Sequence, residues 1–311
     1  MKLIKQLAIL SIILFAVFWV LDVLFTEVFK SGDYNKVQWV NQIENQTFDY
    51  LVHGNSRVYT TMDVGKLNQE TGLKGFNVSV DGSSIVDQAL MLEMFLAKGN
   101  TFKKLFLQID PWSLDNDSIV PFALPKFFPY LKQDLVFRHY SEFGFQWYAY
   151  RYIPFYRYAE FNSIWGPHQV ANDLFKLLPK EYDQNGGHFY TDTTYRGKRD
   201  LEKMEYKVMG GKLKYFSRIV ATCRKNNIEL ITFTSPIANA CLDSAHAKSM
   251  QALQQTMAAR NITYHNFSDI FNQKYEYFTD EIHLNQFGVA AYHPIVKNML
   301  TQSFQTDTTA I

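Results

Sequence analysis

The sequence lacks an excess of charge of either sign. It contains 31 lysines and arginines against 30 aspartates and glutamates, a formal net charge of +1 over 311 residues. Recruiting nucleic acid or an anionic surface by long-range attraction needs a basic patch or a larger net charge. The composition therefore predicts that the protein has no nucleic-acid partner. The chain also lacks internal repeats and low-complexity tracts, which argues against a repeat architecture.

Cysteine is scarce. Cys223 and Cys241 are the only two in the chain, too few for the disulfide framework of a small secreted domain. They are compatible with pairing in an oxidising compartment, and equally with two ordinary buried thiols. Both interpretations stay open at this point.

Two further absences bear on cofactors. The sequence has no Gly-x-Gly-x-x-Gly string and no phosphate-binding loop, so nothing supports dinucleotide or nucleotide chemistry. Its histidines share no metal-ligand spacing, and no cysteine-rich cluster accompanies them. We therefore predict no cofactor and no bound metal.

The strongest positive signal is an apolar run at the amino end. Residues 7–25 contain a single charge, at Asp22, and as a helix they nearly span a hydrocarbon core of about 30 Å. Lys2 and Lys5 precede the run, so the positive-inside rule leaves the amino terminus in the cytoplasm. We expect a retained membrane anchor. The alternative, a cleaved signal peptide, has a shorter apolar region of about 7–15 residues and a small-residue cleavage site.

This anchor sets the expected domain organisation. Residues 1–30 would form a cytoplasmic stub and the transmembrane segment, and residues 31–47 a stalk with a short amphipathic stretch at Val37–Gln46. Residues 48–311 would form the main domain. With the amino terminus inside, that domain lies outside the cytoplasm, in the periplasm or at the cell surface.

Short apolar runs alternate with longer helical segments in the main domain. The alternation predicts an α/β fold with a parallel sheet and crossover helices. The expected strands are Tyr50–His53, Gly75–Val78, Leu105–Ile109, Glu229–Thr234 and Ile262–Tyr264. The expected helices are Val58–Gln69, Ile85–Lys98, Glu205–Asn226, Ala245–Arg260 and Gln286–Thr301. Because ligands bind beyond the carboxyl ends of such strands, the residues that follow each strand are the candidates for a site.

Residues 112–200 break this alternation and are crowded with aromatic side chains, as in FGFQWYAYRYIPFYRYAEF. The segment is expected to be an insertion between two strands. It is either a helical subdomain that packs its aromatics on itself and on the sheet, or a lid or docking surface near the site, because tyrosine and tryptophan suit both sugar stacking and the membrane interface.

The first expected strand ends in LVHGNSRVYT, which places Ser56 on a glycine-containing turn between a strand and a helix. A serine there exposes its hydroxyl above the sheet, and backbone N–H groups at the helix start can stabilise an oxyanion. Serine is also an ordinary helix N-cap, so the string alone does not decide its role.

A second element near the carboxyl end has Asp280 and His283 three residues apart, before the last expected helix. A serine hydroxyl is a poor nucleophile until a base takes its proton, and the usual base is a histidine held by a carboxylate. The pair by itself is also compatible with a capping turn or half a metal site. Together with Ser56 in this order, the combination is much more specific.

On these residues the sequence resembles the SGNH superfamily, also called GDSL-like hydrolases. The family's Gly-Asp-Ser block is similar to Gly54-Asn55-Ser56, and its Asp-x-x-His block is similar to Asp280 to His283. The resemblance covers about residues 48–110 and 205–302. It implies a three-layer α/β domain, with the anchor and the aromatic-rich helical insertion outside it.

The resemblance also implies roles for single residues. Ser56, Asp280 and His283 would be catalytic, and the backbone N–H groups of Ser56 and Gly82 would form the oxyanion hole. Gly82 lies in NVSVDGSSI, where the family has a glycine after its second strand.

One departure concerns the family's third block, which usually supplies an asparagine as a further oxyanion donor. This sequence has Asp110 at the expected strand end, with Asn116 nearby. An ionised Asp110 would repel an oxyanion. Arg57 is either a replacement donor or a solvated surface arginine. Asn55 is the remaining candidate for an oxyanion or substrate contact.

Anchored members of this superfamily outside the cytoplasm resemble proteins that acylate cell-envelope polysaccharides beside a multispanning membrane acyltransferase. The expectation is therefore a serine O-acetyltransferase that acts on a cell-envelope or exported polysaccharide. One alternative is an esterase of carbohydrates or lipids. The other is an inert scaffold that binds a glycan or a membrane partner through its aromatic segment.

Overall fold

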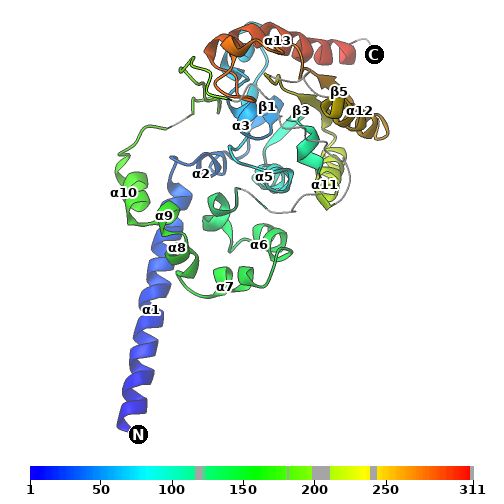
Figure 1. Ribbon diagram of the computed structural model, residues 1–311. Helices are drawn as coiled ribbons and strands as arrows, with labels where there is room; N and C mark the ends of the chain where they lie inside the picture. Colours follow the sequence, from blue (N-terminus) through cyan, green and yellow to red (C-terminus); the bar gives the residue numbers. More distant parts are fainter. Residues whose placement is uncertain (116–120, 122, 181, 198–210, 239–243, 309–311) are drawn as a thin grey trace. The chain divides into compact units, whose positions relative to one another are not determined.

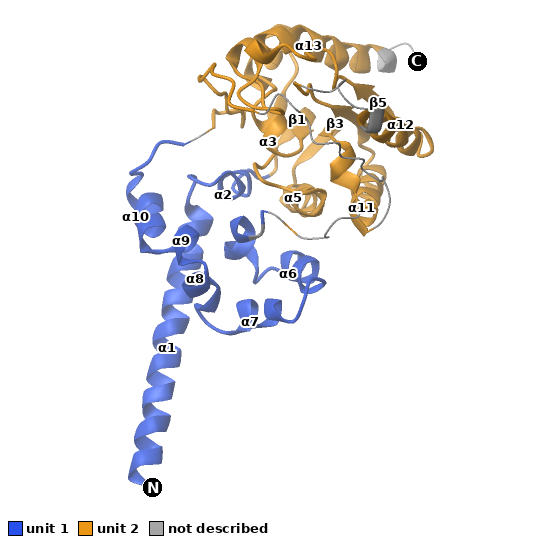
Figure 2. Ribbon diagram, viewed as in Figure 1, with its two compact units in different colours: residues 1–44, 123–181 blue, residues 45–122, 182–311 orange. Residues whose placement is uncertain are grey.

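The computed structural model describes residues 1–115, 121, 123–180, 182–197, 211–238 and 244–308. The chain divides into two compact units (Figure 2). Unit 1 comprises Met1–Glu44 and Ala123–Glu181, and unit 2 comprises Asn45–Phe122 and Tyr182–Ile311. Unit 1 thus groups the apolar amino-terminal segment with much of the aromatic-rich segment, whereas residues 182–197 of the latter belong to unit 2.

Unit 2 is built on a five-stranded parallel sheet with the strand order β2-β1-β3-β4-β5. The strands are β1 (Thr47–His53), β2 (Gly75–Asn77), β3 (Thr101–Gln108), β4 (Glu229–Thr234) and β5 (Thr263–Asn266). Each overlaps a predicted strand, and β4 has the predicted bounds. The predicted α/β class with a parallel sheet is therefore confirmed.

Helices cover both faces of this sheet, which makes three layers (Figure 1). Helices α5 and α11 pack together on one face, whereas α13 covers the other. The helical elements of unit 2 are α3 (Ser56–Tyr59), α4 (Val64–Thr71), α5 (Ile85–Ala97), η1 (Pro111–Leu114), α11 (Gly211–Lys225), α12 (Ser244–Ala258), η3 (Tyr275–Tyr277) and α13 (Gln286–Thr308).

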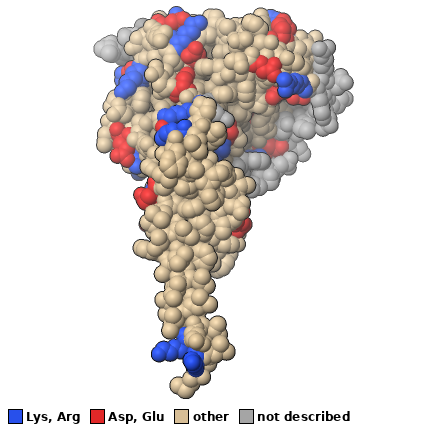
Figure 3. Space-filling view, turned by 90° about the vertical axis from the view of Figure 1, so that its left-hand side faces the viewer, with Lys and Arg blue, Asp and Glu red and all other residues tan. Residues whose placement is uncertain are grey.

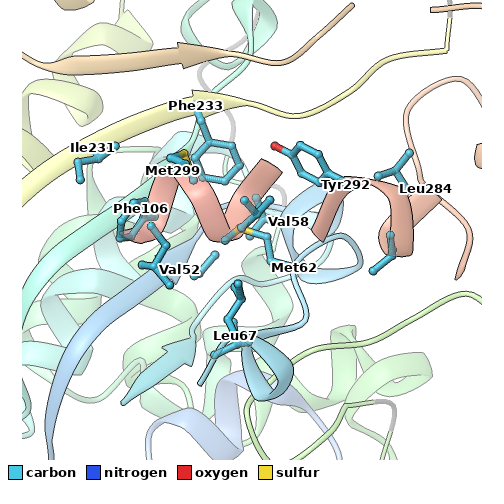
Figure 4. Packing of buried hydrophobic residues seen from close by; sticks show 14 of the residues in the cluster. Val52, Val58, Met62, Leu67, Phe106, Ile231, Phe233, Leu284, Tyr292 and Met299 are labelled. Carbon is cyan, nitrogen blue, oxygen red and sulfur yellow. The ribbon is translucent and has the colours of Figure 1, made fainter. Parts of the chain in front are cut away.

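The main core lies between the sheet and α13. Side chains alternate along each strand, so that Val52 of β1, Phe106 of β3 and Phe233 of β4 share this face. Figure 4 shows them packed against Tyr292 and Met299 of α13. All five side chains are nearly or fully inaccessible to solvent. The apolar runs that predicted the strands are thus the residues that hold α13 on the sheet.

The strand order reverses direction between β1 and β3. From β1 the chain first adds β2 on one side, and β3, β4 and β5 then follow on the other side. In an open parallel sheet the crevice at such a switch point, beyond the carboxyl ends of the strands, is where ligands bind. The residues that follow His53 and Gln108 therefore occupy the favoured position for a site.

Two predicted helical segments are wrong in detail. The predicted helix Val58–Gln69 is two helices, α3 and α4, because the Asp63 side chain accepts a hydrogen bond from the backbone N–H of Lys66 (2.9 Å) and begins a new helix. The amphipathic stretch expected at Val37–Gln46 is helical only in α2 (Lys36–Val40). Its C-cap is Asn41, and Asn45 further along has a left-handed backbone (φ 53°), which a helix could not include.

The predicted cysteine alternatives fall partly outside the described residues. Cys223 of α11 is a buried free thiol, and burial raises its pKa to about 12. Cys241 lies outside the described residues.

Unit 1 gathers short helices around the carboxyl end of one long helix, α1 (Lys2–Ser31), which is long and apolar enough to cross a membrane. Residues 2–20 of α1 are exposed, whereas Asp22, Thr26 and Phe29 are buried. The other elements of unit 1 are α2, η2 (Leu124–Tyr130), α6 (Asp134–Ser141), α7 (Gln146–Tyr152), α8 (Tyr156–Glu160), α9 (Asn162–Trp165) and α10 (Pro167–Phe175).

Unit 1 has a tightly packed aromatic interior. Trp147 and Trp165 are each no more than 2% exposed. The Trp147 ring stacks on Tyr140 (4.7 Å between centroids), and the Trp165 ring meets Phe29 of α1 edge-on (4.6 Å). The aromatic side chains of residues 123–180 therefore pack on one another, as expected, and also on α1.

Gly75, at the start of β2, offers a test of the packing in unit 2. A Cβ at this position would lie 2.0 Å from Cζ of the buried Tyr50. The Tyr50 hydroxyl is held by Asn68 (2.8 Å), so the ring cannot swing away. We predict that Gly75→Ala lowers the free energy of unfolding by about 3 kcal/mol, measured by urea denaturation.

Gly72→Ala is the matched control. Gly72 has a left-handed backbone (φ +72°), but its Cβ would meet no atom within 4 Å. The expected loss is backbone strain of about 1 kcal/mol. Equal losses for the two variants would contradict this account of the contact between β1 and β2.

Candidate active site

Ser56 begins α3 just beyond the carboxyl end of β1. Gly54 permits the close passage of the chain past β3, since a Cβ there would lie 3.0 Å from Cβ of Gln108. Asn55 is the N-cap of α3, and its side chain accepts a hydrogen bond from the backbone N–H of Arg57 (3.0 Å). The cap is thus Asn55, which leaves the Ser56 hydroxyl available for another partner.

That partner is His283. The Ser56 Oγ lies 2.9 Å from His283 Nε2, and His283 Nδ1 lies 2.8 Å from Asp280 Oδ2. A carboxylate only accepts hydrogen bonds, so we assign the imidazole proton to Nδ1. Nε2 then accepts the hydrogen bond from the Ser56 hydroxyl. The structure therefore brings together the three residues singled out in the sequence, as a hydrogen-bonded chain of hydroxyl, imidazole and carboxylate.

Asp280 is fixed as an acceptor by the turn that it begins. Its Oδ1 accepts hydrogen bonds from the backbone N–H groups of Ile282 and His283, both at 2.9 Å. Burial by itself raises the pKa of Asp280, but the hydrogen bonds from the His283 side chain and from these N–H groups outweigh it and hold the pKa below its ordinary value. The carboxylate is therefore ionised at neutral pH.

The turn is held to the rest of unit 2 by Asn285. Its side chain donates to the carbonyl oxygen of Glu276 (2.8 Å) and accepts from the N–H groups of Phe287 (2.9 Å) and Gly288 (3.1 Å). Asn285 is fully buried. This cap joins the Asp280–His283 turn to the start of α13.

Gly82 lies beside Ser56 in the loop that follows β2. The carbonyl oxygen of Gly54 accepts hydrogen bonds from the Val80 N–H (3.2 Å) and from the Ser83 hydroxyl (3.1 Å), which holds this loop against the Ser56 turn. Gly82 has a left-handed backbone (φ +59°) and open space where a Cβ would point. Ser56 and Gly82 line the same cavity.

Arg57 and Asp110 form a buried ion pair, and both are fully inaccessible to solvent. Arg57 Nη2 donates to the carbonyl oxygens of Ser235 (2.6 Å) and Pro236 (2.9 Å), and Nε donates to that of Ile282 (3.2 Å). The interpretation of Arg57 as a solvated surface residue is thus wrong. Its guanidinium ties together loops beyond β1, β3 and β4 and the turn before His283, and is occupied there rather than directed at Ser56.

The negative charge of Asp110 is balanced by the same ion pair. One carboxylate oxygen pairs with Arg57 and the other accepts from the Gln108 side chain, so its charge is compensated away from Ser56. Asn116 lies outside the described residues. Among the residues that the structure describes, no group of three or more His, Cys, Asp or Glu side chains is placed to hold a metal ion.

A cavity of about 230 Å³ opens beside Ser56. Six of its lining residues were not candidates in the sequence analysis: Ser83, Ser84, Ile85, Trp112, Ser113 and Lys212. The Lys212 side chain, from the first turn of α11, is only 9% exposed, and its ammonium donates one long hydrogen bond to the carbonyl oxygen of Trp112 (3.4 Å). A buried ammonium with one long hydrogen bond among the described residues is suited to an anionic or strongly accepting group of a ligand.

Tyr190 is another neighbour of the triad that the sequence did not reveal. Its ring stands nearly perpendicular to that of His283, with centroids 5.9 Å apart. Its carbonyl oxygen accepts a hydrogen bond from the Gln286 N–H (3.1 Å) at the start of α13. Residues 182–197 of the aromatic-rich segment therefore border the site.

Comparisons with known proteins give little beyond this geometry. No family model matches the sequence, and no curated protein matches it. Among solved structures, a crystal structure of a "putative acylhydrolase" from Bacteroides fragilis is 10% identical, with 85% of this chain and 88% of that chain covered and a TM-score of 0.37. A similarity this low leaves the site to be judged from its own residues.

The buried Arg57 leads to a stability prediction. Arg57→Ala would leave the Asp110 carboxylate buried without its cation, so we expect the free energy of unfolding to fall by about 3–5 kcal/mol. The measurement is urea denaturation followed by tryptophan fluorescence.

Arg218→Ala serves as the control, because Arg218 forms a bidentate pair with Glu93 that is partly exposed. Its loss should cost about 1 kcal/mol or less. If Arg57→Ala costs no more than Arg218→Ala, the Arg57 contacts do not hold the loops of the site together.

Proposed function

We propose that the protein is an SGNH-like serine acyltransferase that acts outside the cytoplasm, with an exported or cell-envelope polysaccharide as acceptor. The observation that carries the proposal is the hydrogen-bonded chain from Ser56 Oγ to His283 Nε2 and from His283 Nδ1 to Asp280. Its position at the switch point of a parallel sheet supports the same conclusion.

The mechanism follows from the assigned protons. His283 Nε2 takes the proton of Ser56 as Oγ attacks the acyl carbonyl of a donor ester, and Asp280 stabilises the imidazolium that forms. His283 then gives this proton to the departing alcohol, which leaves an acyl-Ser56. An acceptor hydroxyl transfers its proton to Nε2 and attacks the acyl group, and the proton finally returns to Ser56.

The developing oxyanion needs hydrogen-bond donors other than the Arg57 side chain. Arg57 and Asp110 are paired with each other, so the backbone N–H groups of Ser56 and Gly82 are the donors in this proposal. In other enzymes, removal of one side-chain donor from the oxyanion hole slows the reaction by about 100- to 1,000-fold. A slow reaction is therefore expected.

The size of the cavity favours a small acyl group. Pockets for drug-sized ligands measure about 300–1,000 Å³, whereas the cavity beside Ser56 is about 230 Å³. An acetyl group suits this space better than a long acyl chain. An acetyl esterase, in which water replaces the sugar hydroxyl, uses the same cavity and is the second candidate.

The first experiment treats the detergent-solubilised full-length protein with a fluorophosphonate probe. We expect Ser56 to be labelled, and His283→Ala to slow labelling by at least about 100-fold because the general base is lost. His168→Ala, which removes an exposed histidine of unit 1, should label as the unaltered protein does. A folded protein without labelling at Ser56 would support the inert scaffold.

If labelling occurs, the products distinguish transferase from esterase. The protein is supplied with an acetyl ester and an oligosaccharide acceptor, and the products are analysed by mass spectrometry. Acetylated oligosaccharide is the expected result. Free acetate alone, in the presence of acceptor, identifies an esterase.

Lys212 leads to a prediction about the ligand group that enters the cavity. Two fluorophosphonates of matched length, one with an anionic tail and one with a neutral tail, are compared by their second-order labelling rates. Lys212→Met should lower the ratio of anionic to neutral labelling by about 10-fold or more, because a charge-assisted hydrogen bond is lost.

Lys214→Met removes the same charge from an exposed position two residues further along α11, and should leave the ratio unchanged. An equal change in both variants would mean that the labelling ratio depends only on the net positive charge of α11, not on a contact of Lys212. No change in either would mean that the Lys212 ammonium does not meet the ligand.

A further inference from the structure

The exposed part of α1 ends at a sharp boundary. Residues 2–20 are exposed on every side, although nearly all of them are apolar. Figure 3 shows this exposed part of α1, here called the shaft (residues 2–20), almost free of charged side chains except near its tip. At 1.5 Å per residue, these residues span about 28 Å, close to the thickness of a hydrocarbon core. Packing against unit 1 begins at residue 21.

Asp22 marks that boundary. Its side chain is 1% exposed and pairs with Arg157 Nη1 (3.0 Å) and with Lys132, and it accepts a hydrogen bond from the backbone N–H of Phe155 (3.2 Å). The single charge of the apolar run is thus enclosed by unit 1. Such a network is costly within hydrocarbon, so the edge of the hydrocarbon lies at about residue 21.

The turn between α7 and α8 lies at the same level of α1. The Phe155 ring stacks on Phe18 (6.3 Å between centroids) and meets Phe25 edge-on (4.9 Å). Its neighbours Ile153 and Tyr156 are 53% and 41% exposed. The side chains of Ile153 and Tyr156, at the level of Asp22, are therefore exposed to the medium that surrounds α1 there.

Helix α7 continues this apolar surface. Phe145, Tyr148 and Tyr152 have the spacing i, i+3, i+7 of one helix face and are 83%, 43% and 64% exposed. Their rings are in contact along the row. The opposite face carries the buried Trp147 and Tyr150, so the outward row is not needed for the core of unit 1.

We propose that these five exposed residues form a collar, defined as Phe145, Tyr148, Tyr152, Ile153 and Tyr156, that lies in the headgroup region of the bilayer around the emerging α1. Tyrosine and other aromatic side chains are enriched at this depth because one end is apolar and the other polar. The collar is continuous with the apolar shaft of α1 through Phe155. This inference does not depend on the proposed enzymatic function.

A second exposed apolar group shows that exposure alone is not the argument. Leu177 and Leu178, beyond α10, are 64% and 54% exposed, but the neighbouring Lys176 pairs with Asp33. Asp33 lies beyond the carboxyl end of α1, more than two helical turns past Asp22. This group is therefore too far from the boundary to belong to the collar.

The test uses the full-length protein in phosphatidylcholine vesicles. A single cysteine at Tyr148, in a background with both native cysteines replaced by alanine, carries the environment-sensitive fluorophore NBD. Doxyl groups placed near the lipid headgroups and iodide in the outer solution are the two quenchers. We expect headgroup-level doxyl to quench the Tyr148→Cys probe at least several-fold more than the Leu177→Cys probe, and iodide to show the reverse order.

Two controls keep the test decisive. Ile12→Cys, in the middle of the α1 shaft, should be quenched by doxyl groups placed deep in the acyl chains, which reports that α1 is inserted. With α1 inserted, a Tyr148→Cys probe that iodide reaches as readily as the Leu177→Cys probe would overturn the collar. That result would assign the exposed row to a protein partner instead. Phe145→Cys repeats the measurement at the most exposed position.

Discussion

The site of unit 2 depends on one buried cation. The Arg57 guanidinium bonds to the Asp110 carboxylate and to the carbonyl oxygens of Ser235, Pro236 and Ile282. These partners belong to three separate segments at the carboxyl edge of the sheet, and Arg57 joins all three to its own segment after β1. A rigid fork of donors can satisfy several acceptors at once, so one side chain fixes where Ser56 and His283 meet.

This arrangement explains how a carboxylate at position 110 can lie near the site. A carboxylate at position 110 is compatible with a reacting oxyanion nearby only if its charge is balanced elsewhere. Arg57 provides that balance, and the Gln108 side chain occupies the remaining carboxylate oxygen. The same ion pair therefore organises the loops and keeps the charge of Asp110 compensated.

The sequence revealed the triad because each part of it has a local signature. Ser56 follows a strand and a glycine, and Asp280 and His283 lie three residues apart. Both patterns are recognisable in the sequence, although Ser56 and His283 are separated by 227 positions. Lys212 has no such signature. Its importance comes only from the packing of α11 beside the cavity, which sequence patterns do not encode.

Arg57 was misjudged for a related reason. An arginine after a helix N-cap is usually solvated. The sequence around Arg57 gives no sign that Asp110 and carbonyl groups as far as 225 residues away enclose its side chain. The α/β alternation, by contrast, was readable because apolar runs report burial directly. Helix ends were less predictable, since the start of α4 depends on a single side-chain contact of Asp63.

The enclosure of Asp22 has a consequence for how the chain is made. Its two cationic partners, Lys132 and Arg157, come more than a hundred residues later in the sequence. While the ribosome adds those residues, α1 already emerges with an uncompensated carboxylate one turn from its apolar end. In the membrane placement proposed above, the helix would enter the bilayer with Asp22 left at the aqueous edge. Biosynthesis itself would thus set the depth of the anchor before unit 1 exists to enclose the charge.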